Sequence, residues 1–447
     1  MKLIKNVTVI NEGTTFVASV LIKNDRIAAV IPNEVRDLKT IDADQAEIIN
    51  AQGLWLLPGV IDDQVHFREP GLTHKGDIHS ESRAAIAGGV TTLMDMPNTN
   101  PQTTTIDTLN WKFDRAAETS LANYTFFIGA TNDNLSELKK EGAKRAAAIK
   151  VFMGSSTGNM LVDNQSTLER IFAETDMLIA AHCESETIIK QNIAYYTAKF
   201  GEDLDISFHS KIRSAEACYA SSSEAVRLAT KHNARLHLFH LSTAKEMTLL
   251  ENKALKNKRI TGEVCIHHLW FSDEDYPQYG NLIKWNPSIK TIEDRDALRN
   301  ALVSGKLDVV ATDHAPHLLS EKQGSCLQAA SGGPMVQHSL LAMLEMSRKG
   351  LWTPEMVVEK MCHAPAELFR IKNRGYIREG YYADLVLIDP NRSWKISPEN
   401  VLYKCAWSPM ENQTFSHAVV KTFVNGNLVY DNGIFDEILK GKEIEFI

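Results

Sequence analysis

The sequence lacks several features that would place it in particular classes of protein. No run of apolar residues approaches the roughly 20 that a membrane-spanning helix needs. The first residues, MKLIKNVTVINEG, contain no long apolar segment of the kind found in signal peptides. Internal repeats and low-complexity tracts are also missing. We therefore expect a soluble, cytoplasmic protein with no membrane partner.

Cysteine is scarce, and positive charge is not in excess. The 447 residues include six cysteines and no Cys-x-x-Cys pair, which in a long chain is typical of reduced thiols in the cytosol. The formal net charge is −8, whereas proteins that neutralise nucleic-acid phosphates are usually basic. We expect no nucleic-acid partner, although a local arginine can still bind a small anionic ligand.

The two ends of the chain resemble each other and differ from the middle. Residues 1–55 and 380–447 contain short runs rich in Val and Ile, such as FVASVLIK and ADLVLID, separated by turn signals. The Asn425-Gly426 step between two such runs is a hairpin signal. We expect both termini to form one small β-sandwich domain.

Residues 56–379 alternate between apolar strand-like runs and helical stretches. LLPGVID, VTTLMDMP, AAIKVFMG, MLIAAHCE, RLHLFHLS and LDVVATDHAP are examples of the strand-like runs. This alternation predicts parallel βαβ units, and about seven or eight strands favour a closed (β/α)8 barrel over an open sheet. The predicted fold class is therefore α/β, a TIM-like barrel with a β-sandwich domain.

Five residues that can bind metal stand at or near the C-terminal ends of these strands, where barrel active sites lie. They are His66, Lys150, His182, His240 and Asp313. Taken alone, each histidine could be an ordinary satisfied polar residue, and Asp313 could cap a helix. Lys150 is flanked by apolar residues, so it must be paired, neutralised or modified. A neutral lysine can add carbon dioxide to form a carbamate, an anionic ligand able to bridge two cations.

Together these residues favour a metal site. Imidazole combined with carboxylate-type oxygen suits zinc, and a catalytic zinc lowers the pKa of a bound water. Asp313 could then ligate the metal and also carry a proton from the water to a leaving nitrogen.

Other polar residues are candidates for substrate contacts. Arg68 follows His66 by two residues and would face the same side if the strand continued, which suits a bidentate grip on a carboxylate. The alternative is a surface ion pair with Glu69. Asn98 and Asn286 lie beside prolines and could equally be turn residues, and His317 lies on a loop four residues after Asp313.

The adjacent pair His267-His268 is a weaker candidate. Neighbouring residues on a strand face opposite sides, so at most one of them would point inward. We expect this pair to support other ligands rather than to bind metal.

Several motifs resemble those of the cyclic amidohydrolases of the amidohydrolase superfamily, and dihydroorotases most of all. The motifs are PGVIDDQVHFREPGLTHKGD, GGVTTLMDMPNTNP, IKVFMGSSTG, HLFHLST, EVCIHHL, WNPSIK and ATDHAPHLLSEK. The resemblance implies a (β/α)8 barrel whose binuclear zinc centre is held by the five residues above, with Lys150 carboxylated. It also implies that Arg68, Asn98, Asn286 and His317 bind the substrate.

The activity implied by the resemblance is reversible hydrolysis of dihydroorotate to N-carbamoyl-L-aspartate in pyrimidine biosynthesis, with Asp313 as the proton carrier. Arg68 and Asn98 favour an anionic ring over the neutral rings of hydantoinases, although a hydantoinase or allantoinase activity stays open. A homo-oligomer, dimer or tetramer, is expected because relatives commonly form one.

Gln64 departs from the family pattern, which has His-x-His where this chain has Gln64-Val65-His66. An amide is a poor zinc ligand beside imidazole, so one of the two metals would lose a nitrogen ligand. Three interpretations follow. The enzyme binds one zinc firmly and one weakly, or Gln64 contributes its oxygen or a water, or the protein is a non-catalytic assembly subunit. The other four ligand positions are intact, which favours an active enzyme.

Overall fold

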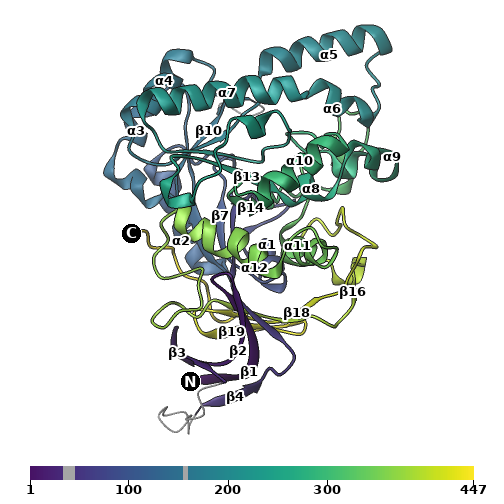
Figure 1. Ribbon diagram of the computed structural model, residues 1–447. Coiled ribbons are helices and arrows are strands. Elements are labelled where there is room, and N and C mark those ends of the chain that lie inside the picture. The colour runs from purple at the N-terminus through teal and green to yellow at the C-terminus, as the bar shows by residue number, and fades with distance from the viewer. Residues whose placement is uncertain (34–45, 155–159) are drawn as a thin grey trace.

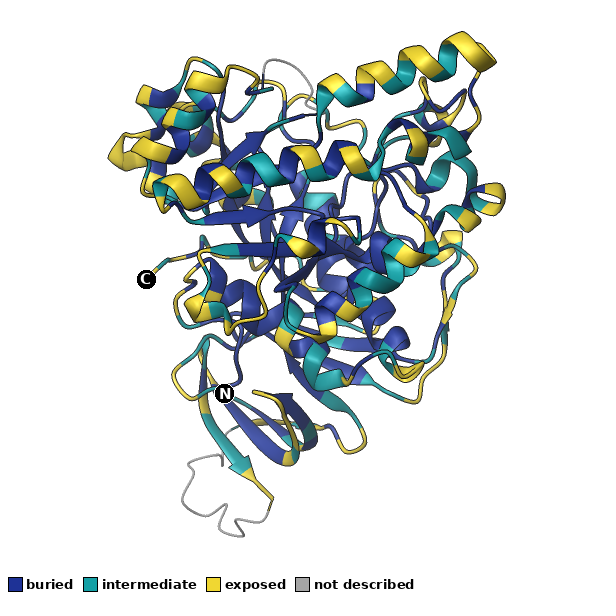
Figure 2. Cartoon of the chain, turned by 45° about the horizontal axis from the view of Figure 1, so that its top comes forward, coloured by how far each residue is buried: buried dark blue, intermediate teal, exposed yellow. Residues whose placement is uncertain are grey.

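The computed structural model describes residues 1–33, 46–154 and 160–447, and it has two parts (Figure 1). A sheet of strands from both ends of the chain, purple and yellow in Figure 1, lies below a larger body of strands and helices from the middle of the chain. Figure 2 shows that the strands at the centre of the molecule are buried, whereas the outer helices expose one face.

The lower part is a nine-stranded sheet in the order β20-β19-β18-β15-β5-β1-β2-β3, with β4 paired to β1. β5 joins the two ends of the chain, because it pairs parallel to β1 and antiparallel to β15. The strands are β1 Lys2–Asn11, β2 Thr14–Lys23, β3 Arg26–Pro32, β4 Glu47–Asn50, β5 Trp55–Pro58, β15 Leu385–Asp389, β18 Ala418–Val424, β19 Asn427–Asp431 and β20 Ile434–Phe435.

The predicted hairpin at Asn425-Gly426 is confirmed. It connects the antiparallel strands β18 and β19, and both turn residues have positive φ, 49° and 76°. The domain boundaries proposed from the sequence stay a prediction. β5 runs from Trp55 to Pro58 and so lies across the first of them.

The upper part is a closed parallel barrel with eight strand positions, which confirms the predicted (β/α)8 fold. β8 and β9 share one position, since β8 pairs with β7 and β9 pairs with β10. A parallel bridge between Val65 and His314 joins the first strand to the last. The strands are β6 Val60–Val65, β7 Val90–Asp95, β8 Asn123–Phe126, β9 Ile128–Gly129, β10 Ile149–Phe152, β11 Ile179–His182, β12 Leu236–Leu238, β13 Ile260–Cys265 and β14 Val309–Ala311.

Helices surround the barrel, and their ends follow from local sequence. The first, α1, begins after the capping side chain of Asp77 and ends at Gly88, as the Gly-Gly signal predicts. The helices are α1 Ile78–Ala87, α2 Ile106–Thr119, α3 Leu135–Leu138, α4 Gln165–Glu174, α5 Glu186–Phe200, α6 His209–Ile212, α7 Ala215–His232, α8 Ile266–Trp270, α9 Tyr276–Tyr279, α10 Ile292–Val303, α11 Ser339–Arg348, α12 Pro354–Val358 and α13 Ala364–Leu368. Two short strands, β16 Trp394–Lys395 and β17 Thr414–Phe415, form a separate pair. None of the described helices has the length and apolar character to cross a membrane.

The placement of His267-His268 on a strand is wrong. Both lie in helix α8, two and three residues beyond the end of β13. For Arg68, the condition that the strand continues is not met, because β6 ends at Val65 and Arg68 lies on a loop with a left-handed φ of 68°. In both places the chain leaves the strand earlier than the run of apolar letters suggests.

Candidate functional site

A cavity of about 740 Å³ opens at the C-terminal ends of the barrel strands. Every residue that the sequence analysis selected as a metal or substrate ligand lines it. These residues are Gln64, His66, Arg68, Asn98, Lys150, His182, His240, Asn286, Asp313 and His317. They come from strands and loops spread over some 250 residues, and closure of the barrel brings them together. Their individual roles remain predictions.

Backbone conformation helps to aim three of these residues. Arg68, His240 and Asp313 follow strand ends and have positive φ values of 68°, 37° and 45°. Such a conformation is uncommon for residues other than glycine and costs about 1–3 kcal/mol each, so the surrounding structure must hold it in place. Strain of this kind tends to collect at functional sites.

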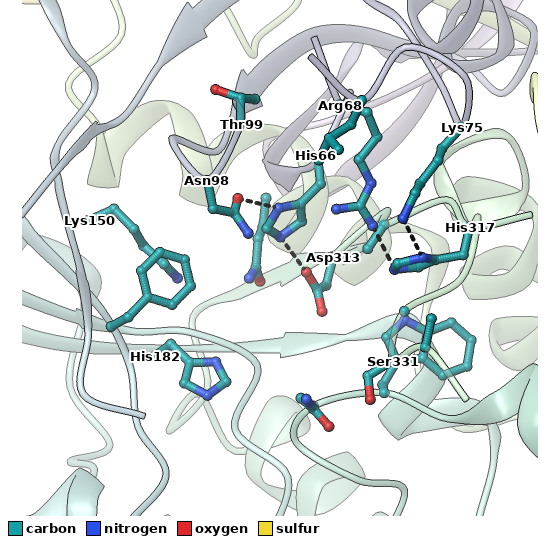
Figure 3. Close-up of a pocket in the computed structure, with 18 of the residues that line it drawn as sticks. His66, Arg68, Lys75, Asn98, Thr99, Lys150, His182, Asp313, His317 and Ser331 are labelled. Carbon is teal, nitrogen blue, oxygen red and sulfur yellow. Dashed lines mark hydrogen bonds and ion pairs between the residues drawn. The ribbon is translucent and has the colours of Figure 1, made fainter. Parts of the chain in front are cut away.

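His66 and Asp313 form the first pair of candidate ligands. The Nδ1–H of His66 donates to Asn98 Oδ1 at 2.8 Å, which directs Nε2 toward Asp313. That Nε2 lies 3.0 Å from Asp313 Oδ1 (Figure 3). An imidazole nitrogen and a carboxylate oxygen that face each other can bind one metal ion together. Asn98 thus orients a candidate ligand, a role that the sequence analysis did not assign to it.

His182 and His240 form the second pair. Glu184 Oε2 accepts the Nε2–H of His182 at 3.0 Å, so Nδ1 of His182 faces Nε2 of His240 at 2.9 Å. Burial lowers the pKa of both histidines, which are therefore neutral at pH 7 and offer lone pairs. Their separation is about 0.4 Å shorter than the roughly 3.3 Å expected between two nitrogen ligands of one zinc ion at the tetrahedral angle, so a small movement of either ring would let both bind the same ion.

Glu184 stays charged in this buried position. Burial alone would raise its pKa, but the charge of Arg213, whose Nη1 lies 2.6 Å from Glu184 Oε2, and the hydrogen bond from His182 lower it well below the usual range. A carboxylate that accepts the second ring proton of a ligating histidine is the usual arrangement around protein-bound metals.

Lys150 is fully buried on β10, and its Nζ has no hydrogen-bond partner among the described residues. The nearest aromatic ring is that of Phe239, whose centroid lies 4.0 Å from Nζ. Burial lowers the pKa of Lys150 to about 8. A large fraction of the amine is therefore neutral near physiological pH, and only the neutral amine reacts with carbon dioxide.

Gln64 lines the cavity beside a local irregularity of β6. Asp62 pairs with Leu93 and Val65 pairs with Asp95, so two residues of β6 stand opposite one of β7. This β-bulge breaks the alternation of the strand. The thiol of Cys265 donates to the Oε1 of Gln64 at 3.6 Å. The structure places an amide oxygen where the family pattern has an imidazole.

A group of cationic and aromatic side chains occupies another part of the cavity (Figure 3). Arg68 donates from Nε to the carbonyl of Pro316 at 3.0 Å, and its Nη2 lies 3.1 Å from Nε2 of His317. The Nζ of Lys75 lies 3.2 Å from Nδ1 of the same ring. Burial and the charges of Arg68 and Lys75 hold the pKa of His317 far below its usual range, so the ring is neutral.

The proposed alternative for Arg68, an ion pair with Glu69, does not occur. Glu69 pairs instead with Arg115 at 2.6 Å. In the described part of the chain, Arg68 forms no ion pair with any carboxylate, although only 8% of its surface is exposed. A buried guanidinium directed into a cavity without an anionic partner is suited to bind an anion.

Some lining residues were not identified from the sequence. Lys75 lies among polar residues at the end of the motif PGVIDDQVHFREPGLTHKGD, where no spacing distinguishes it. Trp285 lines the cavity and stacks on His267, with ring centroids 4.3 Å apart and an interplanar angle of 7°. The Nε2–H of His268 donates to the carbonyl of Pro287 at 3.1 Å. The His267-His268 pair therefore packs behind the cavity wall, and its expected role in supporting other ligands stays a prediction.

Comparisons with known proteins agree with the fold. The sequence pattern of the Amidohydrolase family matches residues 55–429. The dihydroorotase of Halobacterium salinarum is 34% identical over 379 residues, which cover 84% of this chain and 86% of that protein. The dihydroorotase of Carboxydothermus hydrogenoformans is 31% identical over 446 residues, 98% of each chain.

Among solved structures, an L-hydantoinase (dihydropyrimidinase) from Arthrobacter aurescens superposes with a TM-score of 0.92 at 25% identity, over 99% of both chains. The fold of the whole chain, including the sheet built from both ends, is therefore shared with known cyclic amidohydrolases. The chain belongs to the amidohydrolase family, in its dihydroorotase group, and is a hydrolase that acts on cyclic amide C–N bonds.

Proposed function

We propose that this protein is a metal-dependent dihydroorotase that interconverts dihydroorotate and N-carbamoyl-L-aspartate in pyrimidine biosynthesis. The observation that carries the choice of substrate is the buried guanidinium of Arg68, which faces the cavity without a carboxylate partner in the described chain. Dihydroorotate carries a carboxylate on its ring, whereas the rings of hydantoins and dihydropyrimidines are uncharged. The nearby ammonium of Lys75 is paired with Glu321 at 2.7 Å, so it does not take the place of Arg68 as the unpaired cation.

The residues present fit a metal centre. Two pairs of candidate ligand atoms face each other across the cavity, Nε2 of His66 with Oδ1 of Asp313 at 3.0 Å and Nδ1 of His182 with Nε2 of His240 at 2.9 Å. We infer that zinc is held by these four side chains and by a carbamate on Lys150, which has no other partner among the described residues. When bound, zinc supplies an acidified water and polarises the ring carbonyl.

The chain's own residues then bind, orient and move protons. Arg68 holds the substrate carboxylate, with Asn286 and His317 completing the wall around the ring. Asp313 accepts the proton of the attacking water, whose oxygen forms a bond to the ring carbonyl carbon. The C–N bond of the ring breaks, and Asp313 returns the proton to the departing nitrogen. Asn98 keeps His66 oriented throughout by accepting its Nδ1–H.

We infer from Gln64 that the two metals are held unequally. His182 and His240 would supply two nitrogens to one ion, and Glu184 fixes the tautomer of His182. The other ion would have a single nitrogen ligand, from His66, together with oxygen ligands. Nitrogen-rich zinc sites bind more firmly than such a site, so the ion near His66 is expected to exchange more readily.

The experiment that tests this function compares substrates and one pair of variants. Ring opening is measured for dihydroorotate and for an uncharged hydantoin, with zinc counted per chain. Arg68→Ala should lower kcat/KM for dihydroorotate by about 10- to 150-fold, mostly through KM, because it removes a charge-assisted hydrogen-bonding group worth about 1.5–3 kcal/mol. Arg68→Lys keeps the charge and loses the bidentate geometry, so its kcat/KM for dihydroorotate should lie between those of the wild type and Arg68→Ala.

The other outcomes separate the alternatives. Faster hydrolysis of the hydantoin, with no effect of Arg68→Ala on either substrate, would identify a hydantoinase-type enzyme. Stoichiometric zinc without turnover of any cyclic amide would identify a non-catalytic assembly subunit instead.

A further inference from the structure

A second group of ionisable side chains lies inside the barrel and does not line the cavity. It consists of Asp63 on β6, His237 on β12 and Glu263 on β13, and we call it the inner triad. All three residues have no solvent exposure. The mechanism proposed above uses none of them. Two carboxylates and an imidazole buried in this way need either partners or a cation.

The distances within the inner triad suit a bound ion better than direct hydrogen bonds. The Nε2 of His237 lies 3.4 Å from Asp63 Oδ2 and 3.8 Å from Glu263 Oε2. Charge-assisted hydrogen bonds are about 2.7–2.9 Å long. Ligand atoms about 2.1 Å from a zinc ion, by contrast, are separated by about 3.4 Å at the tetrahedral angle and by more at wider angles.

The hydrogen bonds around His237 indicate which of its nitrogens is free. The hydroxyl of Thr261 donates to the carbonyl of Leu236 at 3.2 Å, so it accepts from Nδ1–H of His237, which lies 2.8 Å away. Burial opposes the charged ring, but the hydrogen bonds and charges of Asp63 and Glu263 raise the pKa of His237 to about 9. Without a bound ion, Nε2 therefore carries a proton that faces the two carboxylates, and a cation bound there would replace that proton. A polar group that fixes the outer nitrogen of a histidine in this way is typical of a metal ligand.

The atoms that face the centre of the inner triad form no hydrogen bond with the described residues. Both oxygens of Asp63, Oε2 of Glu263 and Nε2 of His237 lack such a partner. The other oxygen of Glu263 is occupied, since it accepts the backbone N–H of His240 at 3.0 Å. Apolar rings surround the group, with the centroids of Phe239 and Phe369 5.2 and 5.9 Å from that of His237. Two carboxylates and one imidazole thus converge in an apolar environment at distances longer than a charge-assisted hydrogen bond.

We propose that Asp63, His237 and Glu263 form an additional, fully buried site for a divalent cation of the zinc class. One imidazole and two carboxylates are a ligand set that suits such an ion. The ion would connect strands β6, β12 and β13, and through Glu263 it would fix the backbone of His240, a candidate ligand in the cavity. The site is separate from the cavity, so the inference does not depend on the substrate proposed above.

The site is tested by counting metal in variants of the full chain. In Lys150→Ala combined with His182→Asn, the cavity loses its strongest ligands, and after dialysis against a weak chelator this variant should retain about one zinc per chain. Adding Asp63→Asn should remove that last ion. Asp62→Asn is the matched control, because Asp62 is an equally buried neighbour that is bonded to Thr312 and lies outside the inner triad.

A crystal of the wild-type protein gives a measurement that does not depend on the folding of any variant. An anomalous difference peak at the zinc edge is expected between the three side chains. Absence of that peak, with hydrogen bonds of about 2.8 Å in its place, would overturn the proposal and show that the inner triad shares protons. Retention of zinc after Asp63→Asn would also overturn it. Neither result bears on whether dihydroorotate is hydrolysed.

Discussion

Several buried histidines in this protein have one ring nitrogen fixed by a neighbour, while the other faces acceptors. Asn98 fixes His66, Glu184 fixes His182, and Thr261 fixes His237. Such partners choose the tautomer and orient the ring before any metal binds. These partners cannot be recognised by sequence spacing, because Asn98 follows His66 by 32 residues and Thr261 follows His237 by 24.

The candidate ligands themselves were predictable, whereas their neighbours were not. His66, His182, His240 and Asp313 could be selected because each ends an apolar run, and strand ends of a barrel converge. The same reasoning did not identify the residues of the inner triad. His237 and Glu263 lie within their strands, where an alternating polar letter looks like an ordinary outward-facing residue, and only the closed barrel brings them to Asp63.

The lowered pKa of Lys150 predicts how carboxylation depends on pH. With a pKa of about 8, the neutral fraction of the amine is about 3% at pH 6.5 and about half at pH 8. At a fixed concentration of dissolved carbon dioxide, the carboxylation rate of metal-free protein should rise about 16-fold over that interval. Above pH 8 it should rise no more than about twofold, because the amine is then mostly neutral.

Carbon-13 NMR with labelled carbon dioxide measures this rate. Lys150→Ala is the control and should show no carbamate signal at a slow-exchanging, protected position. A rate that keeps rising tenfold per pH unit to pH 10 would mean that burial does not lower the pKa of Lys150. Lys150→Ala should also lose activity, with partial rescue by small carboxylic acids that replace the carbamate oxygens.

At the scale of elements, the places where prediction failed are strand ends. The sequence pattern predicts His267-His268 on a strand, but the chain enters helix α8 there. For Arg68 the sequence leaves the continuation of the strand open, and the chain makes a left-handed turn. A periodic pattern identifies that a strand exists more reliably than it identifies the residue at which the strand ends. The left-handed turn matters for function, because it brings the guanidinium of Arg68 to His317.

The loop after β6 is held against the loop after β7 by a close contact at Gly71. This glycine has φ 83°, and a Cβ atom there would lie only 1.9 Å from the carbonyl oxygen of Asn100. Gly71→Ala should therefore displace the loop that carries Arg68. We expect KM for dihydroorotate to rise at least about tenfold while the zinc content stays unchanged, because the metal ligands lie elsewhere.

Gly201→Ala is a matched control for the effect of backbone strain alone. Gly201 has φ 86° at the end of α5, and a Cβ atom there would meet nothing within 4 Å. Both substitutions should lower stability by about 1 kcal/mol through the positive φ. Only Gly71→Ala should change steady-state kinetics. Equal kinetics in the two variants would mean that the loop contact does not position Arg68.

At the scale of the molecule, the last residues of the chain return from the sheet to the barrel. Tyr124 on β8 donates its N–H to the carbonyl of Lys442 at 3.0 Å and accepts from the N–H of Ile444 at 3.0 Å. The two-ended sheet was predictable, because both ends of the sequence are rich in strand signals. The return of the last residues to the barrel was not predictable, because it depends on a few contacts that leave no periodic pattern in the sequence.

Ile444 and Ile438 offer a direct test of whether this return stabilises the barrel. Both lie in the same terminal segment, but Ile444 is 3% exposed and packs in the apolar cluster with Ile61 and Phe127 of the barrel, whereas Ile438 is 87% exposed. Ile444→Ala should lower the free energy of unfolding by about 2–4 kcal/mol, since it leaves a cavity in that cluster. Ile438→Ala should change it by less than about 0.5 kcal/mol.

Calorimetry followed by activity measurements on heated samples distinguishes one cooperative unit from two. If the sheet and the barrel unfold together, Ile444→Ala shifts a single transition to lower temperature and enzyme activity is lost with it. Two separated transitions, with activity following only the upper one, would mean that the terminal segment can detach while the barrel stays folded. In that case the contacts to Tyr124 would stabilise the end of the chain and not the active site.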